Sequence, residues 1–401
     1  RANLQFDIRR MLSWIDTIFN TESDRMHAIG RRALKNLIVH NREYRYLLEH
    51  SISRCYLAEA PKALESYFEV ITEVLLEHAD YPMPFWRLLG IGLYTLGSEQ
   101  SEIRSKSASI LRALEERQQR NSKIQDFDIS ISDKTKAVYK LAQFEISRRL
   151  SRQHSELAFH IFSEFTFYFN GLQPTAQRNM VAAILPWIQI IELQVDPNGG
   201  PTAQSYVLLA NLFEITIKSS SALHNEVQAL WQALATGPHP GNVQLVLDFI
   251  MSLCLDRREQ NFVEYAKQIV VFLSSTPAGV KVVEFLIMQI TPKAMIPNEK
   301  RETLPPPPDT SQFPYLAELS EALPIGAKQA GFSLGQLSLI LLVDLMVAPV
   351  QPKAEDVPLL LQVVTVLWDH YTPLVQDQAR EMLIHLIHEL VISQIEDETT
   401  V

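Results

Sequence analysis

Apolar residues recur three and four positions apart along much of the chain, which is the period of an amphipathic α-helix. In the stretch 242–255 the only polar residues after the first one are Gln244, Asp248 and Ser252, four positions apart. They form one narrow polar stripe on a helix that is otherwise apolar. A helix of this kind has to be covered on several sides, as in the middle of a stacked helical array.

Three segments share a second pattern, in which an apolar residue is followed by a small residue at +4 and by leucines at +8 and +11. These offsets place all four residues on one helical face, and the small residue allows a neighbouring helix to approach closely. The pattern resembles the second helix of a HEAT repeat. The three sets are Met26, Gly30, Leu34, Leu37; Ile103, Ser107, Leu111, Leu114; and Val375, Ala379, Leu383, Leu386.

Strand signals are scarce. The segment Phe127–Ser132 alternates apolar and polar residues for only a few positions, so we expect a connection that leads to the helix after Asp133. Breaks rich in Gly, Pro and Ser separate segments of helix length. The sequence therefore predicts an all-α fold, a HEAT/armadillo-like α-solenoid of stacked helical hairpins.

One segment interrupts this pattern. Residues 292–313 include four consecutive prolines, Pro305–Pro308, which favour an extended polyproline conformation. They indicate either a docking site for a proline-recognising domain or, as we favour, a stiff surface loop. The predicted divisions are N-terminal helical repeats (1–160), central helical repeats (161–291), the Pro-rich loop (292–313) and acidic C-terminal helical repeats (314–401).

Composition and charge exclude several functions. Only 13 of 401 residues are Gly, which disfavours phosphate-cradling loops, and the net charge of -10 disfavours a general nucleic-acid binder. Residues 1–160 hold 24 Lys and Arg against 21 Asp and Glu, while residues 161–401 hold 12 against 25, so the acidity belongs to the second part. The stretch Leu337–Val343, apolar apart from Ser338, is too short to cross a membrane, so we predict no membrane span.

Few residues suggest chemistry. Glu381, His385 and Glu389 have the i, i+4, i+8 spacing at which carboxylate and imidazole ligands converge on one helical face, but a solvated Glu-His-Glu ladder fits the spacing better. No GxSxG motif is present, and we predict no catalytic residue, no metal and no cofactor.

Arg148, Arg149 and Arg152 form the most visible basic cluster, since Arg148 and Arg152 share a helical face. We expect this cluster to suit the carboxylates or phosphates of a partner. The alternative is that the arginine stems cover apolar surface and leave their heads in water.

The residues themselves resemble a known family. Leu185-Pro-Trp-Ile-Gln-Ile-Ile-Glu-Leu193, Leu230-Trp-Gln-Ala-Leu234 and the loop Gly237-Pro-His-Pro-Gly-Asn242 are similar to the central region of the Furry family of cell-morphogenesis proteins. The ending, from Pro358 through the Trp368-Asp-His-Tyr-Thr-Pro373 stretch to Leu390, resembles the fungal branch of that family most closely.

The resemblance implies a noncatalytic segment of a very large scaffold that packs against other repeats of the same protein. Family members act with NDR/LATS-class protein kinases and their Mob coactivators in polarised growth, cell separation and morphogenesis. We accordingly expect a cytoplasmic protein enriched at the cell cortex or at sites of polarised growth. Two alternatives stay open: a HEAT-type adaptor for linear peptides, and a metal-dependent hydrolase built around Glu381, His385 and Glu389.

Overall fold

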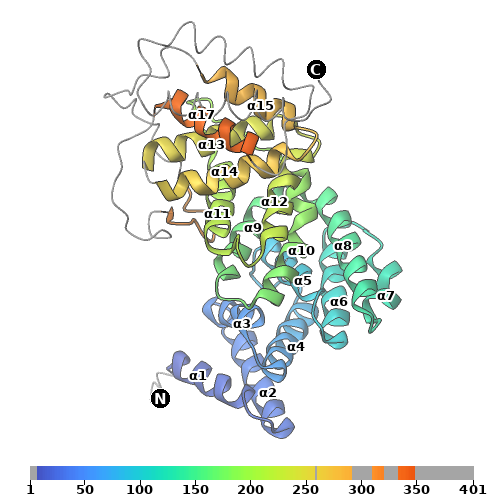
Figure 1. Cartoon of the computed structure of the whole chain (residues 1–401). Helices are drawn as coiled ribbons and strands as arrows, with labels where there is room; N and C mark the ends of the chain where they lie inside the picture. Colours follow the sequence, from blue (N-terminus) through green and yellow to red (C-terminus); the bar gives the residue numbers. More distant parts are fainter. Residues whose placement is uncertain (1–6, 258–259, 291–308, 320–332, 348–401) are drawn as a thin grey trace, which may run out of the picture. The chain divides into compact units, whose positions relative to one another are not determined.

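The computed structural model describes residues 7–257, 260–290, 309–319 and 333–347 (Figure 1). Every regular element in these ranges is a helix, apart from one isolated bridge between Val195 and Pro201. The chain divides into two compact units, Arg1–Trp187 and Ile188–Val401. The predicted all-α fold is confirmed.

The first unit consists of short helical hairpins. Their helices are α1 (Ile8–Phe19), α2 (Asp24–His40), α3 (Tyr46–Leu57), α4 (Pro61–Glu77), α5 (Phe85–Thr95), α6 (Ser101–Arg117), η1 (Ile124–Phe127), α7 (Asp128–Ser132), α8 (Lys136–Gln153), η2 (Ser155–Leu157), α9 (Ala158–Phe169) and α10 (Pro174–Ile190), the last of which reaches into the second unit.

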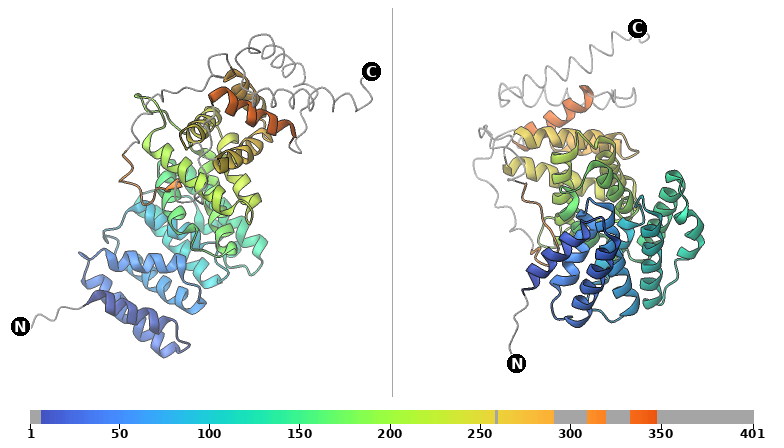
Figure 2. Two further views of the ribbon diagram at one scale, coloured as in Figure 1. Left: turned by 60° about the vertical axis from the view of Figure 1, so that its left-hand side comes forward. Right: turned by 90° about the horizontal axis from the view of Figure 1, so that it is seen from below.

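These hairpins stack in sequence order. The two helices of each pair α1/α2, α3/α4 and α5/α6 pack together, while α2, α4 and α6 form one layer and α3, α5 and α9 form another (Figure 2). Each hairpin therefore buries its apolar face against its neighbours in the sequence, which is the arrangement of an α-solenoid.

The small residues of the predicted pattern lie at helix contacts. A Cβ atom added to Gly30 would lie 2.8 Å from Phe19 Cε1 of α1, so only glycine fits there. All four residues of the second set, Ile103, Ser107, Leu111 and Leu114, are buried as predicted.

In the first set, the prediction for Met26 is wrong, because this side chain is 37% exposed. His27 is buried in its place, since its Nδ1 lies 2.6 Å from Ser66 Oγ and its Nε2 lies 2.7 Å from Thr21 O. Satisfying both ring nitrogens allows a polar residue to lie in the core. The buried face of α2 consequently begins one residue later than the apolar pattern indicates.

The expected connection at Phe127–Ser132 is also wrong. This segment forms the end of η1 and the short helix α7, which packs against α6 and α8. Ile131 is buried and Ile129 is 85% exposed, so the two isoleucines do not share a face as they would in a strand. The two residues whose alternation resembled a strand therefore lie on different sides of a helix.

The second unit continues the same construction. Helices α11 (Ala203–Ser219), α12 (His224–Thr236), α13 (Asn242–Arg257), α14 (Gln260–Ser274), α15 (Gly279–Met288) and α17 (Leu334–Val347) follow in order. Helix α13 contacts α12, α14, α15 and α17, so it is covered on several sides. Within 242–255 the exposed residues of this helix are Gln244, Asp248 and Ser252, and the predicted polar stripe is thereby confirmed.

The loop 237–241 between α12 and α13 offers a test of this packing. A Cβ atom on Gly237 would lie 1.9 Å from the main-chain oxygen of Gln189, whereas a Cβ atom on Gly241 would meet nothing within 4 Å. We expect Gly237→Ala to lower the free energy of unfolding by about 1–3 kcal/mol, because the main chain has to move. Gly241→Ala serves as the control in the same thermal melts, and equal losses in the two variants would contradict the packing.

Some predictions fall outside the described residues. They are the third repeat pattern at 375–386, the family resemblance after Pro358, the possible metal ligands Glu381, His385 and Glu389, and most of the Pro-rich segment. Within the described ranges, none of the helices has the length and apolar character that a bilayer crossing requires.

Candidate partner-binding surface

The predicted arginine cluster lies on α8, where its members point in different directions. Arg148 Nη2 lies 2.8 Å from Glu145 Oε2 on the same helix, and both side chains are partly exposed. Arg152 is exposed and forms no ion pair with any described residue. Ser147, Leu150 and Ser151 occupy the opposite, buried face. Arg148 and Arg152 therefore lie on the solvent-facing side of α8, where Arg148 is paired with Glu145.

Arg149 has a different role. Its Nη1 donates a hydrogen bond to Ser122 O at 3.2 Å and lies 3.7 Å from Asp126 Oδ2. Its guanidinium lies 4.7 Å from the centre of the Phe127 ring, within the range of a cation–π contact. Arg149 consequently fixes the segment between α6 and α7, although the sequence pattern grouped it with two surface arginines.

The α6–η1 loop, residues 118–123, is held in an uncommon conformation. Gln119 and Lys123 both have positive φ angles, in the left-handed region that non-glycine residues rarely adopt. Asn121 Oδ1 accepts a hydrogen bond from Lys123 N at 2.8 Å, and Arg120 donates a side-chain hydrogen bond to Gln153 O at the end of α8. These contacts place the loop that carries Arg120 and Lys123 beside the C-terminal end of α8, where the arginines lie.

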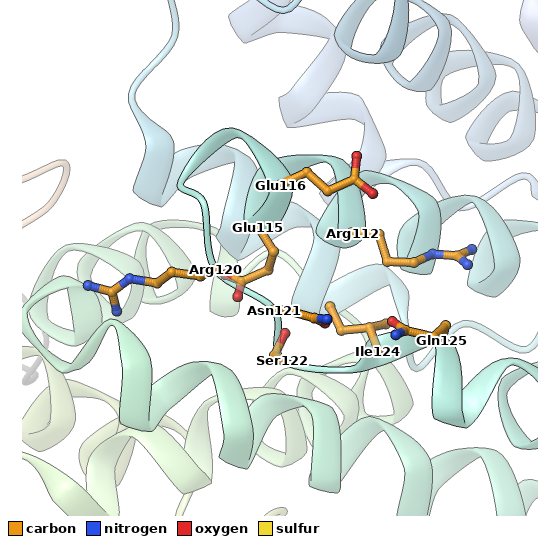
Figure 3. A pocket seen from close by; sticks show the side chains of 8 residues that line it. All are labelled: Arg112, Glu115, Glu116, Arg120, Asn121, Ser122, Ile124 and Gln125. Carbon is orange, nitrogen blue, oxygen red and sulfur yellow. The ribbon is translucent and has the colours of Figure 1, made fainter.

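A pocket of about 340 Å³ opens beside this loop (Figure 3). Glu115 points from α6 towards the loop residues Asn121 and Ser122, while Arg112 and Arg120 point to opposite sides. The lining residues are Arg112, Glu115, Glu116, Arg120, Asn121, Ser122, Ile124 and Gln125.

Glu115 and His154 form a buried pair at one side of the pocket. Glu115 Oε1 lies 2.7 Å from His154 Nε2, and almost nothing of either side chain is exposed. Glu115 Oε2, Ser122 Oγ and Gln153 Oε1 are buried and form no hydrogen bond with described residues. Since Ser122 Oγ is not bonded to His154, the residues do not form a nucleophile–base pair. The pocket is suited to accepting hydrogen bonds from a polar group.

The sequence around the pocket carries an excess of positive charge. Residues 104–152 contain 12 Lys and Arg and 6 Asp and Glu, a net charge of +6 (12 − 6), whereas the whole chain carries -10. We define the basic surface as Arg120, Lys123, Arg148 and Arg152, which are all exposed or partly exposed. Such a surface favours a partner segment that carries carboxylates or phosphates.

A second polar cluster, which the sequence analysis missed, joins α3, α5 and α9. Arg87 Nε lies 2.7 Å from Glu164 Oε1, and Arg87 Nη1 lies 3.0 Å from Glu49 Oε1. Tyr56 donates a hydrogen bond to Glu164 Oε2 at 3.4 Å. Burial raises the pKa of Glu164 to about 7, although the guanidinium of Arg87 opposes the shift. Because Glu164 is buried among packed helices, this cluster is part of the core and not an open site.

No metal centre is visible in the described part of the chain, where no three His, Cys, Asp or Glu residues converge on one point. Cys55 and Cys254 are buried and unpaired, and burial raises the pKa of the Cys254 thiol to about 12. Neither thiol is activated as a nucleophile or as a ligand.

Comparison with known proteins identifies the family. Residues 18–303 match the family model described as the cell morphogenesis central region. The chain belongs to this family of cell-morphogenesis proteins. The match covers both the stacked hairpins of the first unit and helices α11 to α15 of the second, so the resemblance to the Furry family is confirmed.

Two curated relatives extend the match over nearly the whole chain. The cell morphogenesis protein PAG1 of Saccharomyces cerevisiae is 28% identical over 400 residues, which is 99% of this chain and 17% of PAG1. The cell polarity protein mor2 of Schizosaccharomyces pombe is 28% identical over 391 residues, which is 96% of this chain and 18% of mor2. The chain thus spans about one sixth of the length of these family members.

Proposed function

We propose that this chain is a noncatalytic scaffold segment that acts in cell morphogenesis and polarised growth. The observation that carries the proposal is the collinear similarity to a morphogenesis protein and a polarity protein over nearly all of the chain. The stacked hairpins suit such a role, because a preformed surface binds a partner with little loss of conformational entropy. The absence of an activated nucleophile in the described pocket also favours binding over catalysis.

We further propose that the segment binds an NDR/LATS-class protein kinase together with its Mob coactivator. The basic surface on α6–α8 offers exposed guanidinium groups to acidic or phosphorylated segments of that complex. A scaffold that holds the kinase and its coactivator near an activating kinase or a substrate raises their effective concentration for one another. We place this activity in the cytoplasm, at the cell cortex or at sites of polarised growth.

Reversal of two surface charges tests the site. In the double variant Arg148→Glu and Arg152→Glu, we expect the affinity for the purified kinase–coactivator complex to fall at least about tenfold, because two attractive charges become repulsive. Since neither side chain is buried, the melting temperature should change by less than about 2 °C. Biolayer interferometry at two salt concentrations measures the affinity, and raised salt should reduce the difference between the wild type and the variant.

The matched control reverses two exposed arginines of α2, Arg25→Glu and Arg32→Glu, which gives the same change in net charge away from the basic surface. Unaltered binding by this control, together with loss of binding by the α8 variant, supports the assignment. Equal affinities of the two double variants would remove the basic surface from the proposal. Absence of any complex with the wild-type chain would contradict the kinase–coactivator proposal itself.

A further inference from the structure

Residues 309–319 lie against α11 within the second unit (Figure 1): a turn closed by the hydrogen bond from Phe313 N to Thr310 O precedes residues 315–318, which form neither helix nor turn. The segment includes no strand, and its sequence is Asp309-Thr-Ser-Gln-Phe-Pro-Tyr-Leu-Ala-Glu-Leu319. Phe313, Ala317 and Leu319 are buried, Tyr315 and Leu316 are half-buried, and Pro314 and Glu318 are exposed. The part that contacts α11 through its main chain is therefore residues 315–317, with Ala317 buried and the neighbouring Glu318 exposed.

One side chain of α11 forms two hydrogen bonds with the main chain of this segment. Asn211 Nδ2 donates a hydrogen bond to Tyr315 O at 3.1 Å, and Ala317 N donates to Asn211 Oδ1 at 2.8 Å. A single carboxamide thus pairs with the carbonyl of one residue and the amide of the residue two positions later. This geometry requires an extended main chain and is independent of the side chains that it carries.

A second side chain on the same helical face recognises the tyrosine. The Tyr315 hydroxyl lies 2.8 Å from Glu214 Oε1 and 2.9 Å from Glu214 Oε2. Lys218 Nζ lies 3.6 Å from Glu214 Oε2 and places a positive charge beside the carboxylate. Asn211, Glu214 and Lys218 lie at i, i+3 and i+7, and therefore follow one stripe of α11. A phosphate or carboxylate in place of the hydroxyl would be repelled by Glu214.

We propose that this stripe of α11, Asn211, Glu214 and Lys218, is a binding site for an extended peptide, and that residues 313–319 fill it in the manner of such a ligand. The partner that it fits is an unphosphorylated segment with an aromatic residue, a tyrosine and a small residue at alternate positions, as in Phe313, Tyr315 and Ala317. The site belongs to the second unit, whereas the basic surface belongs to the first. The peptide proposal therefore does not depend on the kinase proposal.

The chemistry of the contact favours exchange of the bound segment. The hydrogen bonds of Tyr315 to Glu214 and of Asn211 to Tyr315 O are partly buried, whereas that of Ala317 N to Asn211 Oδ1 is buried, so water can replace the first two as the segment leaves. A segment that occupies its site for nine-tenths of the time weakens a competing ligand about tenfold.

The test uses the full chain and a fluorescent synthetic peptide with the sequence of residues 309–319. In the variant Tyr315→Glu, Glu214 repels the chain's own segment, and we expect the peptide to bind at least about tenfold more tightly than to the wild type. Adding Asn211→Ala to this variant should weaken binding at least about tenfold. Fluorescence anisotropy measures both affinities, and the same peptide phosphorylated on its tyrosine should bind at least about tenfold more weakly than the unmodified one.

The phosphorylated and unmodified peptides are compared on one protein, so their difference does not depend on how a variant folds. If Tyr315→Glu unfolds the chain, limited proteolysis of the wild type replaces the binding measurement on this variant. Excess unmodified peptide should then accelerate cleavage within residues 309–319 several-fold. Equal binding of the two peptides, or cleavage unaffected by the unmodified peptide, would overturn the proposal. So would an affinity that Asn211→Ala leaves unchanged in a folded Tyr315→Glu chain.

Discussion

Replacing Arg104 by leucine is expected to lower the free energy of unfolding by about 3–5 kcal/mol. The side chain is 1% exposed, and its guanidinium donates to three main-chain oxygens. These are Ile131 O at 2.7 Å, Ser98 O at 2.8 Å and Asp133 O at 2.7 Å. Leucine fills a similar volume but donates no hydrogen bond, so all three carbonyls lose their partner.

The same guanidinium lies 3.8 Å from the centre of the Tyr139 ring, so Arg104 connects α6, the α7 segment and α8. The matched control is Arg112→Leu on the same helix. Arg112 Nη1 lies 3.2 Å from Asp128 Oδ2, and both side chains are partly exposed. The loss in this control should therefore stay below about 1 kcal/mol. Chemical denaturation of the full chain measures both, and similar losses in the two variants would contradict the role of Arg104.

Replacing Arg87 by leucine is expected to destabilise the chain by about 3–5 kcal/mol at pH 8, because Glu164 is left as a buried charge without its partner. The loss should be smaller at pH 5. Burial raises the pKa of Glu164 from 4.5 to about 7 in the folded chain, and Arg87 opposes that shift. Removing Arg87 therefore raises the pKa of Glu164 further and favours its neutral form.

The sign of the pH dependence follows from proton binding. Between pH 4.5 and 7 the folded chain holds a proton on Glu164 that the unfolded chain has released, so the contribution of Glu164 to stability falls as the pH rises through about 7. The rise of the Glu164 pKa from 4.5 to about 7 corresponds to a change of about 3 kcal/mol in the free energy of unfolding. The variant Glu164→Gln, which has no titrating group there, should show a flatter stability profile.

Denaturation of the wild type, Arg87→Leu, Glu164→Gln and the double variant between pH 4 and 8 separates the two effects. We expect Arg87→Leu to lose its additional pH dependence when Glu164→Gln is added, because the titrating carboxyl is then gone. A pH dependence of Arg87→Leu that persists in the double variant would assign the effect to other groups.

The sequence predicted those parts of the fold that depend on neighbouring positions of one helix. The stripe of Gln244, Asp248 and Ser252 is exposed, and the face of Ile103 and Leu114 is buried, because helical periodicity alone determines both. The buried histidine of α2 was not predictable in this way. His27 depends on Ser66, 39 positions away, and such a partner has no signature in the local pattern.

The candidate site was predicted only in part, for the same reason. The spacing of Arg148 and Arg152 indicated a shared exposed face. The role of Arg149 depends on Ser122 and Phe127 in a loop with left-handed residues, and charged residue types carry no signal for such a conformation. The pocket around Glu115 and the pair of Arg87 with Glu164 arise from contacts between different helices, and periodicity does not reveal them.

The residues that carried the family resemblance prove to be structural. Asn242 is buried, accepts a hydrogen bond from Leu193 N at 2.9 Å and donates to Ile191 O at 2.8 Å. Trp187 Nε1 donates to Ser147 Oγ at 2.9 Å in the first unit. These side chains hold segments about 40 to 50 positions apart together, which explains why residues with a structural role can form recognisable motifs.

Crosslinking mass spectrometry of the chain reconstituted with a purified NDR/LATS-class kinase and its Mob coactivator tests the central claim most directly. The proposal predicts a stable complex in which Lys123 of the basic surface, and Lys134 and Lys136 near the opposite end of α8, crosslink to the kinase or the coactivator. The same lysines should lose these crosslinks in the Arg148→Glu and Arg152→Glu variant. A complex crosslinked solely through other helices would contradict the proposed surface, and failure to form any complex would contradict the proposed partners.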